Sequence, residues 1–309
     1  MKKILLTFLI ITLFLSACKP KDNTAISGDA ITLTDAFGNK VSLLADAKIA
    51  SCYASFAECL QLAGIDPVGV TEDAVSDHGL EFSDDTVILG TVKEINLEKV
   101  IALNPDYLIL SADLTAHTKL EQSLKSAGIK YGYYRVDTFS DYAVFMKQLC
   151  DFSDRDDLYA KNVTEVKNRI VALLEKIPDS TDKNALLLRV YSTGVKAKRD
   201  DNLAGQILKE LGVSNIADAN EGFLEDLSVE QIIKENPDYI FALSMGAEAA
   251  AKEYLSQNFE NNPAFTGLDS VKNKNYVFLP KDLFHYKPNN RWDESYEYLA
   301  KIIYPEIFK

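Results

Sequence analysis

The fold is decided by the stretch LEKVIALNPDYLIL at residues 97–110, because the chain repeats it as VEQIIKENPDYIFA at residues 229–242. Each copy has a short amphipathic segment, an Asn-Pro break and an apolar run. This order indicates a helix followed by a buried strand. The sequence therefore contains the same helix–strand unit twice, once in each half. Without a gap, Glu98, Ile101, Asn104, Pro105, Asp106 and Tyr107 match Glu230, Ile233, Asn236, Pro237, Asp238 and Tyr239.

Around the two copies, short apolar runs alternate with amphipathic stretches, and the series begins again after Pro178. Strands that alternate with helices indicate βαβ units and a mostly parallel sheet. We therefore expect an α/β protein with two Rossmann-like lobes, at 31–138 and 180–309. The predicted strands lie at 48–53, 66–71, 106–111, 129–136, 184–192, 238–244 and 275–280, and the predicted helices at 55–64, 117–128, 204–212, 228–236 and 291–308.

The segment between the lobes has the most regular helical pattern of the chain. Its apolar residues recur in steps of four and three, which places them on one stripe of a helix. A helix over 158–177 measures about 30 Å at about 1.5 Å per residue. We expect residues 139–179 to connect the lobes as a rigid helical spine, with a ligand crevice between the lobes. The stripe consists of Tyr159, Val163, Val166, Ile170, Leu173 and Ile177.

The N-terminal residues predict export and a lipid anchor. Two lysines precede an apolar run at 4–16, which is too short to cross a bilayer comfortably and is typical of a secretory signal peptide. The LSAC sequence at 15–18 resembles the lipobox of bacterial lipoproteins, so we expect residues 1–17 to be removed and Cys18 to receive the lipid. A plain signal peptide with an accidental cysteine is the alternative. Residues 18–30 then form a polar tether, and the lipid alone holds the chain to the extracytoplasmic face of the cell membrane.

The composition excludes several classes of function. A net charge of −13 argues against nucleic acid or an anionic membrane face as a partner. Cys52, Cys59 and Cys150 are odd in number and form no CxxC motif, so we expect buried free thiols. The absence of a GxSxG elbow, a phosphate loop and a paired-histidine motif argues against an enzyme. A binding protein without a cofactor of its own is expected, and a non-transport surface lipoprotein is the alternative from another class.

Both copies of the repeated unit place a glutamate in the first helical turn. Asn96 and Ser228 precede the two helices as N-caps, and Glu98 and Glu230 follow them. The helix dipole favours a carboxylate there by about 0.3–1 kcal/mol, which explains either glutamate by itself. A matched pair, one in each lobe, indicates a partner that touches both lobes at once.

In these blocks the sequence resembles the substrate-binding lipoproteins of ABC importers for iron–siderophore complexes, haem and vitamin B12. The resemblance implies that Glu98 and Glu230 form salt bridges with arginines of a permease dimer served by a cytoplasmic ATPase. It also implies a monomeric protein with two similar lobes that dock on a two-fold symmetric membrane pair. It covers essentially the whole chain after Cys18 and rests on residues 48–71, 89–110, 207–218 and 227–241.

The expected ligand site lies in loops, because ligands of two-lobed α/β proteins bind beyond the carboxyl ends of the strands. These loops are rich in basic residues although the chain is acidic, so we expect an anionic ferric siderophore-type chelate. Arg189 ends an apolar strand and Arg291 precedes the only tryptophan, so both are expected to be counter-charges, with Trp292 near the ligand. For the tyrosines, a core position is the alternative. The expected ligand-binding residues are Tyr53, Ser55, Thr91, Lys93, Tyr134, Arg135, Arg189, Arg199, Met245, His285, Arg291 and Trp292.

Haem and cobalamin are the alternative ligands. Haem-binding relatives use a histidine and a methionine from opposite lobes as axial ligands. Here His78 and Met245 lie in facing loops, but with the lobes exchanged relative to that pattern. Neutral cobalamin would gain less from the arginines. No firm metal site is expected, because the three histidines are scattered, and His117 is expected to be exposed on a polar helix face.

Overall fold

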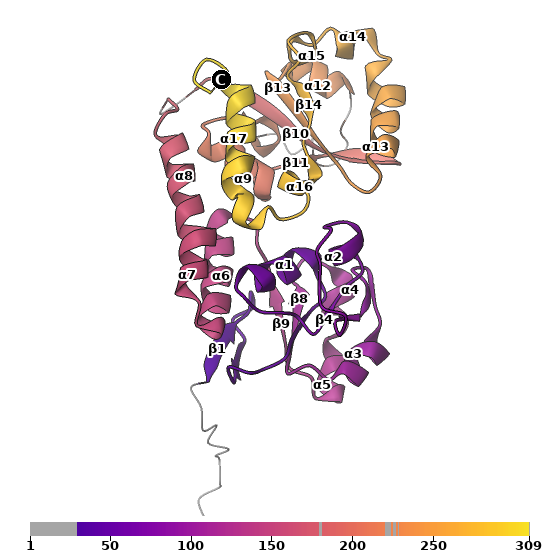
Figure 1. Cartoon of the computed structure of the whole chain (residues 1–309). Coiled ribbons are helices and arrows are strands. Elements are labelled where there is room, and N and C mark those ends of the chain that lie inside the picture. The colour runs from indigo at the N-terminus through magenta and orange to yellow at the C-terminus, as the bar shows by residue number, and fades with distance from the viewer. Residues whose placement is uncertain (1–29, 179–180, 220–223, 225–226, 228, 309) are drawn as a thin grey trace, which may run out of the picture.

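The computed structural model describes residues 30–308 except 179–180, 220–223, 225–226 and 228 (Figure 1). The expected signal peptide, Cys18, most of the tether and the N-cap Ser228 lie outside the described residues. Within the described ranges, no helix is long and apolar enough to cross a membrane. The chain forms two α/β lobes that helices join along one side (Figure 1).

The first lobe is built on a parallel five-stranded sheet, which confirms the predicted fold class. In sheet order its strands are β5 (Val87–Ile88), β4 (Gly69–Val70), β3 (Ile49–Ser51), β8 (Tyr107–Ser111) and β9 (Tyr131–Tyr134). All five residues of β8 are buried, as its apolar run predicted. Around the sheet lie the hairpins β1 (Ile31–Thr34)–β2 (Lys40–Leu43) and β6 (Gly90–Thr91)–β7 (Glu94–Ile95), and the helices α1 (Ala54–Leu62), α2 (Asp73–Ser76), α3 (Leu97–Leu103), α4 (Thr115–Thr118) and α5 (Glu121–Ala127).

The second lobe has a mixed five-stranded sheet. Its strands are β10 (Asn184–Tyr191), β11 (Gly194–Lys198), β12 (Ser214–Asn215), β13 (Tyr239–Ser244) and β14 (Tyr276–Phe278). β12, β13 and β14 continue the parallel pattern, whereas β11 returns antiparallel to β10, with Gly194 opposite Tyr191 and Lys198 opposite Leu187. The sequence predicted no strand directly after 184–192, and Arg199 was expected in a ligand-binding loop, whereas residues up to Lys198 form this edge strand.

The helices of the second lobe cover both faces of its sheet (Figure 1). They are α9 (Leu203–Glu210), α10 (Ile216–Ala219), α12 (Val229–Glu235), α13 (Glu248–Leu255) with the π-helical turn η2 (Ser256–Glu260), α14 (Pro263–Thr266), α15 (Asp269–Lys272), α16 (Lys281–Phe284), the 3-10 turn η3 (Asn289–Arg291) and α17 (Trp292–Ile303). α17 ends before residue 308, where the sequence predicted its end, because Pro305 restricts the helical conformation of the residue before it.

The repeated unit ends its helix in the same way in both lobes. The side chain of Asn96 caps α3 by accepting a hydrogen bond from the Lys99 amide at 3.0 Å. α3 ends at Asn104, whose φ is 46°, and α12 ends before Asn236, whose φ is 42°. Asparagine tolerates this left-handed conformation, and the following proline cannot continue the helix. The Asn-Pro pair thus turns the chain from the helix into the buried strand.

The connection between the lobes is helical. It consists of α6 (Phe139–Ser153), α7 (Asp156–Tyr159), the π-helical turn η1 (Ala160–Thr164) and α8 (Glu165–Leu174). The chain reverses at Asp154, whose φ is 55°, so that α6 lies beside α7 (Figure 1). From Asp156 to Leu174 the helical backbone is unbroken, where the sequence predicted a helix at 158–177.

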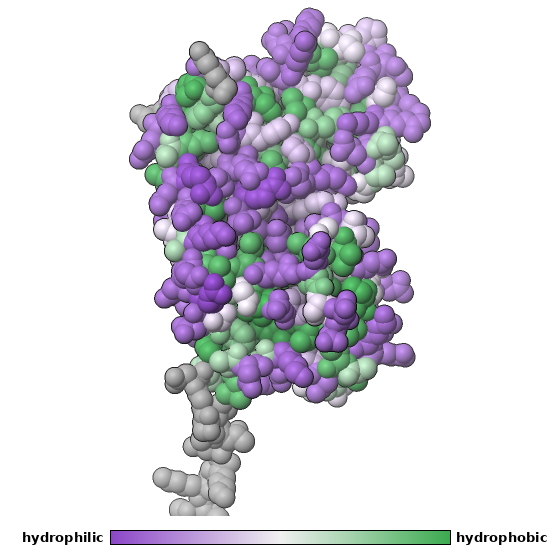
Figure 2. Space-filling model, viewed as in Figure 1, coloured by the Kyte–Doolittle hydropathy of each residue, from purple (hydrophilic) through white to green (hydrophobic). Residues whose placement is uncertain are grey.

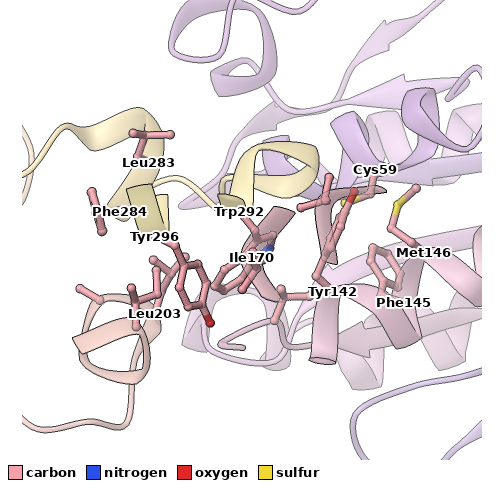
Figure 3. Packing of buried hydrophobic residues seen from close by; sticks show 14 of the residues in the cluster. Cys59, Tyr142, Phe145, Met146, Ile170, Leu203, Leu283, Phe284, Trp292 and Tyr296 are labelled. Atoms are coloured by element: carbon pink, nitrogen blue, oxygen red, sulfur yellow. The ribbon is translucent and has the colours of Figure 1, made fainter. Parts of the chain in front are cut away.

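One hydrophobic cluster passes through this connection into both lobes. It contains Ile49 of the first lobe, Val166 and Ile170 of α8, and Leu187 and Trp292 of the second lobe. Figure 3 shows Ile170 beside Trp292, with side chains of α6 next to them. The lobes therefore share a packed core along the spine, which opposes a large hinge movement between them.

Candidate functional site

The two lobes face each other across a hollow on the side away from α7 and α8 (Figure 2). Inside this crevice lies a cavity of about 120 Å³ to which both lobes contribute side chains. The second lobe supplies most of the lining from one stretch, residues 285–291, which we call the bridging segment. The lining residues are Glu58, Asp77, His78, Asp282, Tyr286, Lys287, Pro288 and Arg291.

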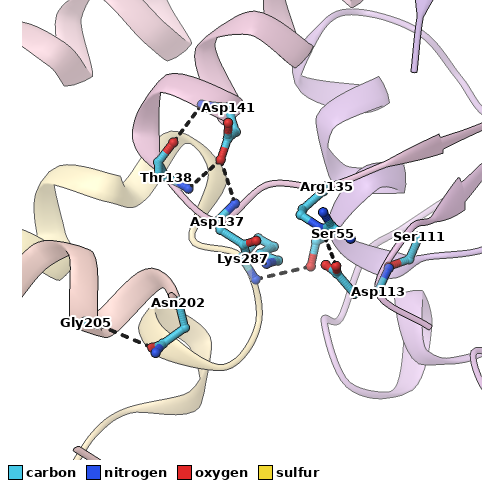
Figure 4. A network of polar contacts seen from close by, with 10 residues as sticks. All are labelled: Ser55, Ser111, Asp113, Arg135, Asp137, Thr138, Asp141, Asn202, Gly205 and Lys287. Carbon is cyan, nitrogen blue, oxygen red and sulfur yellow. Dashed lines mark hydrogen bonds and ion pairs between the residues drawn. The ribbon is translucent and has the colours of Figure 1, made fainter. Parts of the chain in front are cut away.

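The bridging segment is bound to the first lobe by polar contacts (Figure 4). The Lys287 ammonium lies 3.1 Å from an Asp137 carboxylate oxygen, and the Lys287 amide donates to the Ser55 hydroxyl at 3.3 Å. The Asn289 side-chain amide donates to the Ser55 carbonyl at 2.9 Å and to the Glu58 carboxylate at 2.6 Å. Asn289 is only 1% exposed, so these bonds are shielded from water. The floor of the crevice is thus a fixed contact between the lobes.

Aromatic rings line the crevice around Tyr286. The His78 ring of the first lobe lies 4.5 Å from the Tyr286 ring, between centroids, and the His285 ring lies 5.1 Å from it. Burial, together with the positive charges of Lys281 and Arg189, lowers the pKa of His285 to about 4. Burial also lowers the pKa of His78. Both rings are therefore neutral at neutral pH, which suits them to stack on a planar ligand.

Arg189 is the basic residue best placed for an anionic ligand. It lies near the carboxyl end of β10, is half-buried and contributes its positive charge to the surroundings of His285. Among the described residues, its guanidinium forms no hydrogen bond or ion pair. A half-buried arginine without a carboxylate partner can offer its donors to an anion at little cost.

The other arginines of the expected site are engaged elsewhere. Arg291 lines the cavity, but its guanidinium binds Asp282 at 3.0 Å and Glu294 at 2.9 Å. Arg135 is paired with Asp113 at 2.5 Å. Arg199 follows β11, which runs back from the carboxyl edge of β10, so the expectation that Arg199 lies in a crevice loop is wrong. Arg135 lies near Ser55 and the bridging segment (Figure 4), but Arg135 and Arg291 are both already paired with carboxylates.

Two of the expected aromatic contacts are wrong because the side chains belong to the core. Trp292 is fully buried and packs edge-on against Phe139, with ring centroids 6.1 Å apart. Tyr134 is 4% exposed, and its hydroxyl is 2.9 Å from that of Tyr107. Tyr53 stays half-buried at the carboxyl end of β3. Burial and the negative charges of nearby aspartates raise its pKa to about 12, so it remains a neutral phenol.

The remaining expected residues lie at the carboxyl edges of the sheets without meeting in one place. Thr91 and Lys93 are exposed in the hairpin that follows β5, and Ser55 is buried beneath the bridging segment. Met245 is half-buried directly after β13, in the lobe opposite His78. Its amide donates to the Val190 carbonyl at 2.7 Å.

His117 is not exposed, contrary to the expectation from its helix. It is completely buried, its Nδ1 accepts a hydrogen bond from the Ser111 amide at 2.9 Å, and its Nε2 lies 2.9 Å from the Val92 carbonyl. His117 therefore holds the hairpin β6–β7 against the end of β8. No group of three or more His, Cys, Asp or Glu side chains suited to a metal ion occurs in the described part of the chain.

Sequence reasoning missed Glu58, Asp137 and Asn289, which join the lobes. A signal for Glu58 was present, since it is the only charged residue in the apolar helix 55–64. Burial raises the pKa of Glu58, while the hydrogen bond from Asn289 and the charge of Arg291 act in the opposite direction. A half-buried carboxylate is stabilised by such partners, and only the fold shows which residues supply them.

Glu98 and Glu230 are exposed in the first turns of α3 and α12. Neither lines the crevice cavity, and each lies in the lobe that the repeated unit predicted. Both glutamate side chains are therefore accessible to solvent.

Comparisons with known proteins agree with this architecture. The Fe(3+)-citrate-binding protein YfmC of Bacillus subtilis (strain 168) is 24% identical over 283 residues, which cover 87% of this chain and 86% of the relative. The petrobactin-binding protein YclQ of the same organism is 25% identical over 295 residues, covering 90% and 91%. A crystal structure of the triscatecholate siderophore-binding protein FeuA from Bacillus subtilis, complexed with ferri-bacillibactin, shares the fold. It superimposes with a TM-score of 0.69 at 18% identity, and the match covers 88% of this chain and 98% of that chain. The family described as periplasmic binding protein matches residues 49–283, and the chain belongs to this family.

Proposed function

We propose that this protein captures a ferric siderophore-type chelate outside the cytoplasm and delivers it to the permease of an ABC importer. Membership of the periplasmic binding protein family supports a binding protein rather than an enzyme. Relatives that span most of the chain are named for ferric citrate and petrobactin. The observation that carries the proposal is Arg189, a half-buried cation without a partner among the described residues, beside the rings of the crevice.

The ligand lies between the lobes with its negative charge toward the second lobe. Arg189 supplies the counter-charge, and the neutral rings of His285, Tyr286 and His78 supply a surface for planar groups. A neutral ligand gains less from the charge of Arg189 than an anion does. This arrangement therefore favours an anionic chelate over cobalamin.

Docking and anchoring complete the proposal. Glu98 and Glu230 are one exposed carboxylate on each lobe, suited to pair with arginines of the two permease subunits. The lipid on Cys18 holds the protein at the extracytoplasmic face of the membrane, where it works as a monomer with a permease and an ATPase as partners.

The test is a parallel titration of the purified protein with ferric citrate, a ferric catecholate, a ferric hydroxamate, haem and cyanocobalamin. Isothermal calorimetry suits it better than tryptophan fluorescence, since Trp292 is buried against Phe139. We expect the tightest binding for an anionic ferric chelate. Saturation by cobalamin alone contradicts the proposal. Low-spin haem binding that is lost in both His78→Ala and Met245→Ala replaces it with haem capture.

A further inference from the structure

An apolar groove lies on the first lobe, outside the ligand crevice. It has a volume of about 420 Å³, and Val75, at its edge, is 49% exposed. Leu80, Phe82 and Ile88 pack beneath it on a small buried cluster formed by α1, α2 and β4, so the groove has a fixed floor. The lining residues are Val75, Leu80, Glu81, Phe82, Ser83, Thr86 and Ile88.

The groove is linked to the helix that carries Glu98. The side chain of Lys99, the residue after Glu98, donates to the carbonyl of Ile88 at 2.9 Å, which ties α3 to the groove. Ile101, one turn after Glu98 on α3, is 47% exposed. α2 and α3 both lie on the side of the lobe away from α7 and α8, and hydrophobic surface is visible over α2 (Figures 1 and 2). The helices that carry Val75 and Glu98 thus lie on the same side of the lobe.

The charge around the groove selects the kind of partner. The stretch 81–88 that lines the groove carries three exposed carboxylates, Glu81, Asp84 and Asp85, and the Lys99 ammonium reaches one end of it at the Ile88 carbonyl. Such a rim repels an anionic lipid surface and a second copy of this chain, whose net charge is −13. It attracts a basic segment that carries an apolar side chain.

We propose that this groove receives an apolar side chain, flanked by lysine or arginine, from an extracytoplasmic segment of the permease. The inference rests on the proposed function, since it places the groove beside the docking contact of Glu98. It adds an apolar anchor to that contact and makes the first lobe the stronger half of the interface. Buried apolar anchors with a charged rim are the usual arrangement of a protein interface.

The first experiment maps the contact in intact cells. The photo-crosslinking amino acid p-benzoylphenylalanine replaces Val75 in the full-length lipoprotein, and Val144 in a matched control. Val144 is 61% exposed on α6, so it is an apolar surface residue outside the groove. We expect position 75, and not position 144, to crosslink to a lysine- or arginine-containing extracytoplasmic segment of an integral membrane protein. Equal yields at both positions, or adducts with lipid or with a second copy of the chain, overturn the proposal.

The second experiment tests charge and apolarity together. Val75→Lys and Val75→Glu remove the same apolar side chain but introduce charges of opposite sign, and Val144→Lys is the control. We expect uptake of the iron chelate to fall about tenfold in Val75→Lys, less in Val75→Glu, and not in Val144→Lys, while the chelate Kd stays unchanged in all three. Equal uptake in Val75→Lys and wild type overturns the proposal.

A reference variant separates this inference from the proposed function. Glu98→Ala with Glu230→Ala should abolish uptake without changing the chelate Kd. If the double variant abolishes uptake and Val75→Lys does not, the groove is not an anchor but docking through the glutamates stands. If neither changes uptake, the proposed docking fails as well.

Discussion

Replacing Arg189 by glutamine tests whether the crevice is built for an anion. Glutamine keeps most of the length and some of the donors of the side chain but removes the positive charge. Arg189 is half-buried and has no carboxylate partner among the described residues, so a bound anion loses a contact that nothing nearby replaces. Lys281 and Lys287 are occupied by the Gly246 carbonyl and by Asp137.

The size of the effect follows from the kind of contact. A hydrogen bond to a charged group contributes about 1.5–3 kcal/mol, which is about tenfold to 150-fold in Kd. Arg291→Gln is the matched control, since Arg291 is already held by Asp282 and Glu294. The carboxylates of Asp282 and Glu294 neutralise most of the charge of Arg291. We therefore expect Arg291→Gln to raise the chelate Kd by no more than about threefold.

Calorimetric titration at fixed ionic strength with the tightest-binding ferric chelate measures both variants. Removing Arg189 should also raise the pKa of His285 from about 4, because the charge of Arg189 is one of the causes that lower it, and NMR titration of the histidines detects this shift. The reasoning is refuted if Arg189→Gln leaves the Kd within threefold of wild type while Arg291→Gln weakens binding tenfold or more.

Three further predictions concern the bridging segment and the anchor. Asn289→Ala removes the donors to the Ser55 carbonyl and to the half-buried Glu58, and should lower the free energy of unfolding by about 2–4 kcal/mol in urea titration; a loss below about 1 kcal/mol contradicts the contact. The folded pKa of His285, about 4, lies below the ordinary value of 6.5, so the unfolded chain takes up its proton first as the pH falls. This group alone should reduce the free energy of unfolding by about 2 kcal/mol between pH 8 and pH 5, and an unchanged slope in His285→Gln argues against it. Cys18→Ser should move the protein from the detergent phase to the aqueous phase in Triton X-114 partitioning, and partitioning like that of wild type excludes Cys18 as the anchor.

The fold was predictable because its signals are local. The Asn-Pro pairs at Asn104 and Asn236 mark the same helix end in both lobes, and the short apolar runs that follow them indicate buried strands, which the structure shows. The antiparallel β11 was missed although Thr193-Gly194 is a turn signal between the apolar run of β10 and a stretch, at 195–198, in which apolar residues alternate with lysines. That omission is why Arg199 was expected in the crevice.

The site was predictable only in part because partners cannot be read from loop sequences. Arg189 and Arg291 are both arginines beside apolar residues, and only the fold shows that Asp282 and Glu294 occupy Arg291. Trp292 is different, since its burial was visible in the sequence. Trp292, Tyr296, Leu299 and Ile303 follow helical spacing and form the buried stripe of α17, which indicates a core residue rather than a ligand contact.

The hydrophobic cluster that runs from the first lobe through α8 into the second has a consequence for how such proteins diversify. Ile49, Ile170 and Leu187 lie in one packed core, so neither lobe is a separable module. A lobe exchanged with that of a relative would meet a spine shaped for another neighbour, and the mismatch would destabilise both halves. New ligand preferences can therefore arise by substitution in the crevice loops, where a changed side chain leaves the shared core intact, and not by recombining lobes.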